Sequence, residues 1–221
     1  MKPKFRFIYK SKIFIVKMHR YFITAIGTDS GKTLTSAIFV QALQADYWKP
    51  VQSGLPKDAD TIAQLVDFPV CIHPSAYEFA KPASPHDAAK AENKQIHLSE
   101  INLVETKNHL IVEGAGGLLV PLNDEHFVAD LIQKFDLEVI LVINLYLGCI
   151  NHSLLSIQEL KRRNLKVKGI IFNGEPNEET QNIILHHSRY KCLLHIYPEK
   201  QINKEVVKKY AAILLEKLEN L

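Results

Sequence analysis

The sequence predicts an α/β fold in three layers, with a mainly parallel central sheet and helices on both faces. Apolar segments of strand length alternate along the chain with helical segments of about 10–16 residues. Residues 138–145 are almost entirely hydrophobic, as expected of a strand that is buried on both faces. No internal repeat or linker interrupts this alternation, so we expect one domain.

Each element is predicted from its own pattern. Residues 20–26 form an apolar strand, and a glycine-containing loop separates them from a helix at 33–44. Residues 46–51 form a short strand. Acidic residues open a helix at 58–66, and Pro and Asp lie near the start of another at 84–93. The remaining strands are expected at 109–114, 138–145, 167–173 and 192–197, and the remaining helices at 127–135, 151–163, 177–188 and 203–218.

The charge of the chain is unevenly distributed. Residues 1–17 contain six Lys or Arg and no acidic residue, whereas the rest contains 21 basic and 24 acidic residues. We expect residues 1–17 to be a disordered extension or an artefact of a start site upstream of Met18, and residues 18–221 to form the domain. The domain shows no basic face for nucleic acid. No apolar run approaches the roughly 20 residues of a membrane span.

The three cysteines, Cys71, Cys149 and Cys192, are far apart in the sequence and odd in number. This usage indicates a reducing compartment, and we expect the protein to be cytoplasmic. No Cys-x-x-Cys pair indicates structural zinc.

The stretch AIGTDSGKT, residues 25–33, resembles a phosphate-binding loop of the form G-x-x-x-x-G-K-[ST]. Its last three residues fit the pattern. Counted back from Gly31, the first glycine of the pattern should stand at position 26, which is Ile26 here, and the glycine of this chain is one position later, at Gly27. The loop follows a predicted strand and opens a helix, where free N–H groups and the helix dipole favour an anion. We therefore interpret it as a phosphate site of P-loop NTPase type rather than a plain turn.

Two acidic residues are candidates for binding Mg²⁺, which prefers oxygen ligands. Glu113 follows a buried strand in LIVEGAGG, although a glycine-rich turn with an incidental acid is the alternative. Asp60 in KDADT heads a predicted helix, where an N-cap is as reasonable as a metal ligand. Lys49 in YWKPVQSG is either a solvated lysine or a second cation beside the phosphate loop.

These pieces together resemble dethiobiotin synthetase, the ATP-dependent enzyme of biotin synthesis. The resemblance runs from about Arg20 to the C-terminus and is carried by YFITAIGTDSGKT, YWKPVQSG, EFAKPASPH, VEGAGGLLVPL and LGCINHSLL. The family loop, G-T-D-T-x-x-G-K-T, is one residue longer than the standard one. Ala25 takes the place of its first glycine. The structure must therefore show whether the backbone at Ala25 has a positive φ, which would favour glycine.

The resemblance implies a reaction. The family joins CO₂ to 7,8-diaminopelargonic acid with ATP and Mg²⁺, through a carbamate and a carbamic–phosphoric anhydride, and yields dethiobiotin, ADP and phosphate. It also implies a homodimer, in which the corner at residues 147–155 completes the partner's substrate site.

Roles follow residue by residue from the resemblance. Lys49 and Lys32 are the catalytic residues, Ser53 and Asn151 contact the substrate, and Mg²⁺ is bound by Thr33, Asp60 and Glu113. Simple N-capping is the alternative for Asn151. Asn173 reads the adenine through its amide. The complete set expected to bind ATP is Thr28, Asp29, Ser30, Gly31, Lys32, Thr33, Leu34, Asp60, Glu113, Gly114, Ala115, Gly116 and Asn173.

Three other functions are compatible with parts of the sequence. A ParA/MinD-like regulatory ATPase needs an extra lysine near the start of the loop, and residues 25–28 contain none. A nucleotide-dependent scaffold without chemistry gives no role to Lys49. A cobyrinate-type amidation enzyme normally carries a glutaminase domain, for which 221 residues leave no room.

Overall fold

The computed structural model describes residues 18–220, and the predicted extension at residues 1–17 lies outside them. Seven strands form the central sheet in the order β4-β2-β6-β1-β7-β8-β9, and every neighbouring pair is parallel. This confirms the predicted parallel sheet. Its strands are β1 (Arg20–Ala25), β2 (Asp46–Trp48), β4 (Ile72–His73), β6 (Leu110–Gly117), β7 (Glu138–Asn144), β8 (Val167–Asn173) and β9 (Cys192–Ile196).

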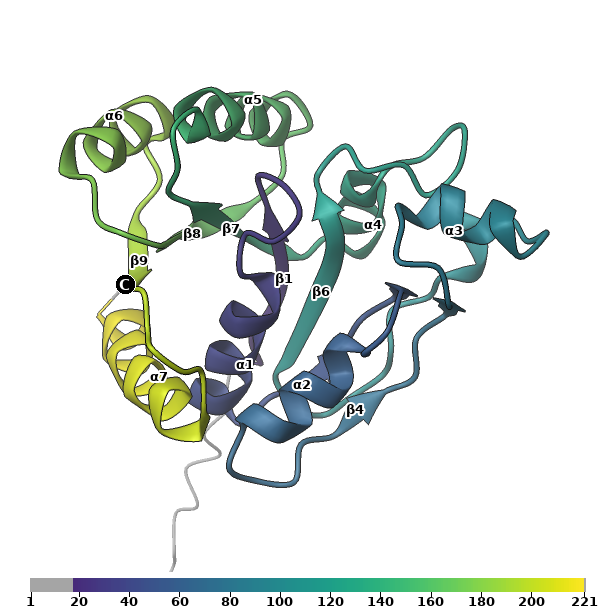
Figure 1. Cartoon of the computed structure of the whole chain (residues 1–221), viewed down its shortest axis with the longest axis horizontal. Coiled ribbons are helices and arrows are strands. Elements are labelled where there is room, and N and C mark those ends of the chain that lie inside the picture. The colour runs from purple at the N-terminus through teal and green to yellow at the C-terminus, as the bar shows by residue number, and fades with distance from the viewer. Residues whose placement is uncertain (1–17, 221) are drawn as a thin grey trace, which may run out of the picture.

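Helices cover both faces of the sheet, as predicted (Figure 1). Phe22 and Ile23 are neighbours on β1, and their side chains enter two different cores on opposite faces. The core that contains Ile23 is closed by α1 (Lys32–Leu43), α2 (Asp58–Leu65) and α7 (Lys204–Glu219). The core that contains Phe22 is closed by α3 (Pro85–Ala91), α4 (Val128–Phe135), α5 (Cys149–Arg162) and α6 (Glu178–Ser188).

The strand predicted at residues 46–51 is divided in the structure. Pro50 has no N–H to donate to a sheet, and the chain leaves the central sheet between Trp48 and Val51. It continues as β3 (Val51–Ser53), which pairs with β5 (Tyr77–Phe79) in a separate two-stranded parallel sheet. The carbonyl of Pro50 accepts from the N–H groups of Ala76 and Tyr77 at 2.9 and 3.1 Å. Lys49 therefore lies at the junction of the two sheets.

The carboxyl ends of β1, β2 and β6 lie side by side in the central sheet. Ligands of open parallel sheets bind beyond these ends, so residues that follow the three strands can meet at one site. A short 3₁₀ helix (Leu98–Glu100) lies in the segment before β6. Among residues 18–220, no helix combines the length and the apolar character that crossing a membrane requires.

Candidate functional site

The loop between β1 and α1 is held by its own serine. Oγ of Ser30 lies 3.0 Å from the carbonyl oxygen of Gly27 and 2.8 Å from Oδ1 of Asn144, which ends β7. Two loop residues adopt a positive φ, Asp29 at 54° and Gly31 at 95°. The loop is thereby folded back on itself at the N-terminus of α1, where backbone N–H groups are available to an anion.

Ala25 is an ordinary strand residue. It is the last residue of β1, is fully buried, and pairs with Val142 of β7. It is absent from the residues with positive φ, and so is Gly27. The glycine that the loop needs conformationally is Gly31, so alanine at position 25 imposes no backbone strain.

Lys32 opens α1 and is buried. Its Nζ donates to the carbonyl oxygen of Gly27 at 3.3 Å, so the ammonium reaches back over the loop. Burial lowers the pKa of Lys32, and the nearby carboxylate of Glu113 opposes this shift. An anion in the loop would meet this ammonium together with the backbone N–H groups.

A cluster of hydroxyl, ammonium and carboxylate groups lies beside the loop. Oγ1 of Thr33 is 3.0 Å from Oε1 of Glu113 and 2.5 Å from Oδ1 of Asp58. Nζ of Lys49 is 2.7 Å from Oδ2 of Asp58 and 3.2 Å from Oε1 of Glu113. Residues from α1, α2, β6 and the junction after β2 thus converge within ion-pair distance.

The charges of this cluster stabilise one another. Burial opposes the charge on Lys49, but the carboxylates of Glu113 and Asp58 outweigh it and raise the pKa of Lys49. Burial also opposes the charge on Asp58, and the ammonium of Lys49 with the hydroxyl of Thr33 outweighs it and lowers the pKa of Asp58. At neutral pH both groups are therefore charged, and the solvated-lysine alternative for Lys49 does not hold.

Asp58, not Asp60, is the second carboxylate of the cluster, and the predicted role of Asp60 as a ligand stays a prediction. Asp58 is the first residue of α2, and its N–H donates to Oε1 of Gln52 at 3.2 Å. Asp60 is two residues, or roughly 200°, further around the helix, and it is exposed. Both acids lie in the first turn of α2, so the sequence alone could not tell which one faces Thr33.

Tyr47 is a member of the cluster that the sequence analysis missed. Its hydroxyl donates to Oε2 of Glu113 at 3.0 Å, and the residue is fully buried. Burial, together with the Glu113 carboxylate, raises the pKa of Tyr47 well above its ordinary value, so the hydroxyl remains a donor. One signal for it was available, because Tyr47 and Lys49 are two positions apart and share one side of an extended segment.

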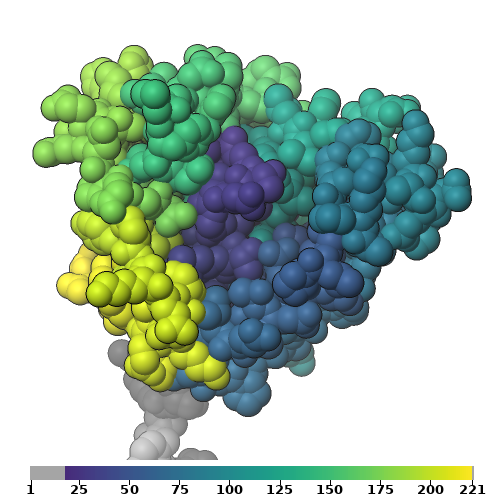
Figure 2. All heavy atoms as spheres, viewed as in Figure 1, coloured from purple at the N-terminus to yellow at the C-terminus, as the bar shows by residue number. Residues whose placement is uncertain are grey.

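A cavity of about 720 Å³ is lined by Lys32 and by four residues of the cluster, Thr33, Lys49, Asp58 and Glu113, whereas Tyr47 lies behind it. Figure 2 shows the purple segment of β1, loop and α1 in the middle of the visible face, flanked by blue and teal segments on one side and by green and yellow segments on the other. Of the predicted site residues, the cavity is lined by Thr28, Asp29, Gly31, Lys32, Thr33, Leu34, Lys49, Ser53, Glu113, Ala115 and Gly116, and also by Gln52 and Asp58.

The end of β6 passes close beneath the loop. A Cβ atom at Gly114 would lie 2.8 Å from the ring of Phe22, and Gly116 has a φ of 62°. At Gly116 a Cβ would also approach Oγ1 of Thr28, at 3.6 Å. The glycines of LIVEGAGG therefore allow the end of β6 to pack closely against the phosphate-binding loop, and Glu113 precedes them on the same strand.

Asn173 supports the loop from the end of β8. Its Nδ2 donates to the carbonyl oxygen of Ser30 at 3.1 Å. A methyl group at Gly31 would lie 2.5 Å from the same Nδ2. The amide of Asn173 thus packs against the loop backbone at the start of α1, and its predicted contact with adenine stays a prediction.

Ser53 ends β3 and lines the cavity. Its Oγ is buried and has no hydrogen-bond partner among residues 18–220. A buried hydroxyl without a partner costs free energy, so this group is suited to a polar ligand in the cavity.

Comparisons with known proteins agree with this geometry. The model of an AAA domain family, AAA_26, matches residues 19–206. The ATP-dependent dethiobiotin synthetase BioD of Cytophaga hutchinsonii is 60% identical over 202 residues, which cover 90% of this chain and 98% of that protein. The protein of the same name from Christiangramia forsetii is 44% identical over 194 residues, 86% of this chain and 93% of that protein.

The chain belongs to the ATP-dependent dethiobiotin synthetase family. Its fold is also shared by more distant proteins. One of them is a putative plasmid partition protein of Borrelia burgdorferi, whose structure was solved with bound AMPPNP. The superposition covers 93% of this chain and 100% of that chain, with a TM-score of 0.55 and 14% sequence identity. At this identity the likeness shows the P-loop fold alone, whereas the sequence relatives show the dethiobiotin synthetase family.

Asn151 lies apart from the cavity of this dethiobiotin synthetase family member. It is exposed in the first turn of α5 and does not line the cavity. Large apolar side chains around it are also exposed, and these are Tyr146, Leu147, Ile150 and Leu155. The predicted contact of Asn151 is with substrate in the partner's site, and it stays a prediction.

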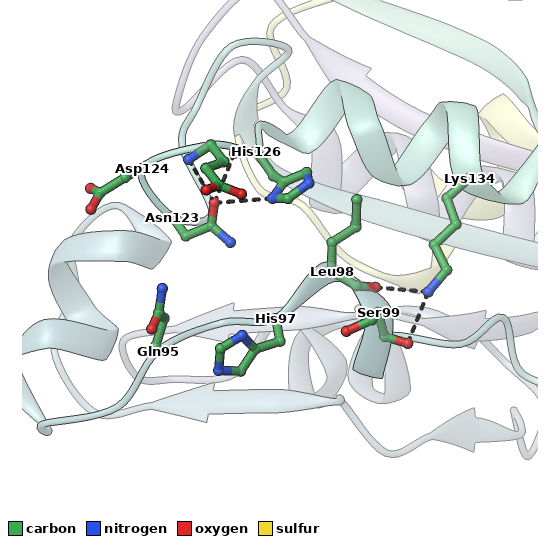
Figure 3. Close-up of a pocket in the computed structure, with 9 residues that line it drawn as sticks. Gln95, His97, Leu98, Ser99, Asn123, Asp124, His126 and Lys134 are labelled. Carbon is green, nitrogen blue, oxygen red and sulfur yellow. Dashed lines mark hydrogen bonds between the residues drawn. The ribbon is translucent and has the colours of Figure 1, made fainter.

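A second cavity, of about 610 Å³, lies between the segment before β6 and the loop before α4 (Figure 3). Its lysine, Lys134, already donates to the carbonyl oxygens of Leu98, Ser99 and Ile101 at 2.7, 3.2 and 2.7 Å. Asn123 likewise accepts from the N–H groups of Glu125 and His126 at 2.9 and 2.8 Å. These groups stabilise the protein's own loops, and the phosphate-binding loop takes no part in this cavity.

Proposed function

We propose that this chain is an ATP- and Mg²⁺-dependent cyclo-ligase that joins CO₂ to 7,8-diaminopelargonic acid and closes the ring to dethiobiotin, with ADP and phosphate as the other products. Membership of the dethiobiotin synthetase family, over nearly the full length of a 60% identical relative, supports this function. The observation that carries it is the position of Lys49, whose ammonium lies in the same cavity as the phosphate loop and Ser53.

The chemistry has three steps. One substrate amine adds to CO₂ and loses a proton, which gives a carbamate. A carbamate oxygen attacks the γ-phosphorus of ATP and expels ADP, which gives a carbamic–phosphoric anhydride. The second amine then attacks the carbonyl carbon, the ring closes, and phosphate leaves.

The protein's contribution to these steps is position and charge, as phosphoryl transfer requires. Lys32 and the N–H groups from Asp29 to Leu34 hold the triphosphate. The ammonium of Lys49 stabilises the carbamate and the transferring phosphoryl group. Its raised pKa keeps it charged at neutral pH, and burial strengthens its attraction to an anion.

Thr33, Asp58 and Glu113 fit Mg²⁺. The hydroxyl oxygen of Thr33 lies 2.5 Å from Oδ1 of Asp58 and 3.0 Å from Oε1 of Glu113, and an all-oxygen set of this kind is what Mg²⁺ prefers. When bound, Mg²⁺ would neutralise charge on the β- and γ-phosphate oxygens. In this proposal Asp58 replaces Asp60 as the metal ligand.

Substrate would be held by Ser53 of one copy and Asn151 of a second. The unpartnered Oγ of Ser53 supports the first contact. The exposed apolar groups of Leu147 and Ile150 beside Asn151 support a homodimer that buries this face. In such a dimer the N-terminus of α5 would approach the carboxylate of the substrate in the partner's cavity.

The adenine would lie near Asn173, whose amide has both a donor and an acceptor. The cytoplasm is the proposed compartment, because the three cysteines are free in the structure and one of them, Cys71, is exposed. Neither nucleic acid nor a membrane is a partner in this proposal.

The assay that tests this function supplies diaminopelargonate, bicarbonate and Mg·ATP, and measures phosphate release together with the mass of the organic product. We expect phosphate release that depends on the diamine and a product with the mass of dethiobiotin. ATP turnover that ignores the diamine would instead indicate a regulatory ATPase.

Two lysine variants separate the roles in the same assay. Lys49→Ala is expected to abolish ring closure and to leave ATP binding largely intact, whereas Lys32→Ala should damage both. Near-full activity of Lys49→Ala would overturn the assignment of Lys49.

A further inference from the structure

A cluster of three different ligand types lies at the edge of the central sheet. Asp46 is the first residue of β2, and the parallel pairing of Trp48 with His73 of β4 places Cys71 beside it. Because side chains alternate along a strand, Cys71 and His73 share one face of the edge strand. The edge strand β4 (Figure 1) and the residue before it thus bring a half-buried imidazole and an exposed thiol next to a buried carboxylate.

The three potential ligand atoms are close enough to share one ion. Nε2 of His73 is 3.1 Å from Oδ2 of Asp46 and 4.0 Å from Sγ of Cys71, and all three atoms lie within 4.8 Å of one another. Tetrahedral zinc with ordinary bond lengths separates a nitrogen from an oxygen ligand by about 3.3 Å and from a sulfur ligand by about 3.5 Å. Small side-chain rotations would close the remaining difference.

Neighbouring groups hold the carboxylate in place. Oγ1 of Thr106 donates to Oδ2 of Asp46 at 2.6 Å, and Nδ2 of Asn108 donates to Oδ1 at 3.0 Å. Such outer hydrogen bonds orient metal ligands. Asp46 is buried, whereas Cys71 is exposed, so an ion has access from solvent to an oriented carboxylate.

We propose that Asp46, Cys71 and His73 form a binding site for one zinc ion, with a fourth position open to water. The thiolate and imidazole favour zinc over Mg²⁺, which prefers oxygen alone. On binding, Cys71 releases its thiol proton to solvent, and the thiolate and carboxylate together balance the two charges of the ion. The ion links the two-residue edge strand β4 to β2, and it is separate from the Mg²⁺ site proposed at Glu113.

Cobalt is the probe for this site. Co²⁺ added to the untagged full chain, with excess Mg²⁺ to occupy the all-oxygen site, should give a thiolate-to-cobalt charge-transfer band and the visible bands of tetrahedral cobalt. One equivalent of Zn²⁺ should remove both. Zn²⁺ alone should raise the melting temperature, because an ion that binds only the folded state stabilises it.

Variants locate the site. Cys71→Ser should lose the charge-transfer band and the thermal shift, while Cys192→Ser, a half-buried cysteine on β9, should keep both. Thr106→Val leaves all three ligands and removes one support of Asp46, so zinc should bind roughly 10–100-fold more weakly. A wild-type protein without the band, or a Cys71→Ser variant that retains it, overturns the proposal. Zinc binding that Thr106→Val leaves unchanged would overturn the role of Thr106 in orienting Asp46.

Discussion

Tyr47 donates a hydrogen bond of 3.0 Å to Oε2 of Glu113, while Oε1 of the same carboxylate faces Thr33 and Lys49. The buried carboxylate is thereby held from both sides. Tyr47 contacts Glu113 only at Oε2, the oxygen that faces away from Thr33 and Lys49. We therefore expect Tyr47 to act on the site by positioning this carboxylate.

Tyr47→Phe should weaken the dependence of activity on Mg²⁺ without removing ATP binding. A hydrogen bond to a charged group contributes about 1.5–3 kcal/mol, so the Mg²⁺ concentration for half-maximal phosphate release should rise roughly tenfold or more. Tyr21→Phe is the matched control, because that buried hydroxyl lies 3.1 Å from Nδ1 of His19 instead. An unchanged Mg²⁺ titration for Tyr47→Phe would contradict the positioning role.

Asp58→Asn and Asp60→Asn form a pair that tests which acid belongs to the site. Asp58→Asn removes the charge that is 2.7 Å from Lys49, and activity at saturating ATP should fall by at least roughly tenfold. Asp60→Asn changes an exposed side chain on the same helical turn and should leave activity near wild type. Phosphate release measured for both variants under the same conditions decides between them. A large loss of activity in Asp60→Asn, with near-normal activity in Asp58→Asn, would indicate Asp60 as the ligand.

Ala25→Gly tests whether the stretched loop needs a glycine at its start. Because Ala25 is a strand residue, the change should lower the free energy of unfolding by about 0.5–1 kcal/mol and leave ATP affinity unchanged. Gly31→Ala should impair ATP binding, since its Cβ would lie 2.5 Å from Asn173. Urea unfolding and nucleotide titration measure the two effects. Tighter ATP binding by Ala25→Gly would show that the loop does need the glycine.

Glu159 should contribute to the stability of the protein in mild acid. Arg162 first, and then Arg163, lower the pKa of Glu159 from 4.5 to about 2. Between these pH values the native carboxylate stays charged while the unfolded one takes up a proton, so the unfolded state binds more protons. The stability from this group is present above pH 4.5 and is lost as the pH falls toward 2.

The measurement for Glu159 is urea unfolding at a series of pH values from 5 to about 2. Glu159→Gln should lower stability at pH 5 and show a shallower loss on acidification. Glu175→Gln, an exposed glutamate beyond β8, serves as the control and should follow the wild-type curve. Identical slopes for the wild type and Glu159→Gln would show that the arginines do not protect this charge.

The fold could be predicted from the sequence because its central strands are long and apolar throughout. Residues 138–145 and 167–173 were each expected within one residue of β7 and β8. Strands of two or three residues carry no such pattern, so β4 and β5 were missed. The break at Pro50 was also missed, although its missing N–H gave a reason to expect one.

The site was predictable where a local motif carries it, as in the loop from Thr28 to Leu34 and at Glu113. It was not predictable where the choice depends on how a helix is rotated, as with Asp58 and Asp60. Tyr47 belongs to the site through a contact with Glu113 across 66 positions of sequence. Its alternation with Lys49 places it on the same side of the segment, but this local pattern does not show which residue it contacts. The division of the chain at residue 18 stays a prediction.

The pairing of Lys49 with Asp58 and Glu113 has a consequence for the protein between turnovers. Two buried ammonium groups, Lys32 and Lys49, share the cavity with the buried carboxylate of Glu113 and the half-buried carboxylate of Asp58, so these four charges balance. The remaining carboxylate of the lining, Asp29, is exposed to solvent. Release of products therefore leaves no uncompensated buried charge, which would otherwise favour unfolding. The folded state therefore does not depend on bound substrate or nucleotide to compensate the charges of its active site.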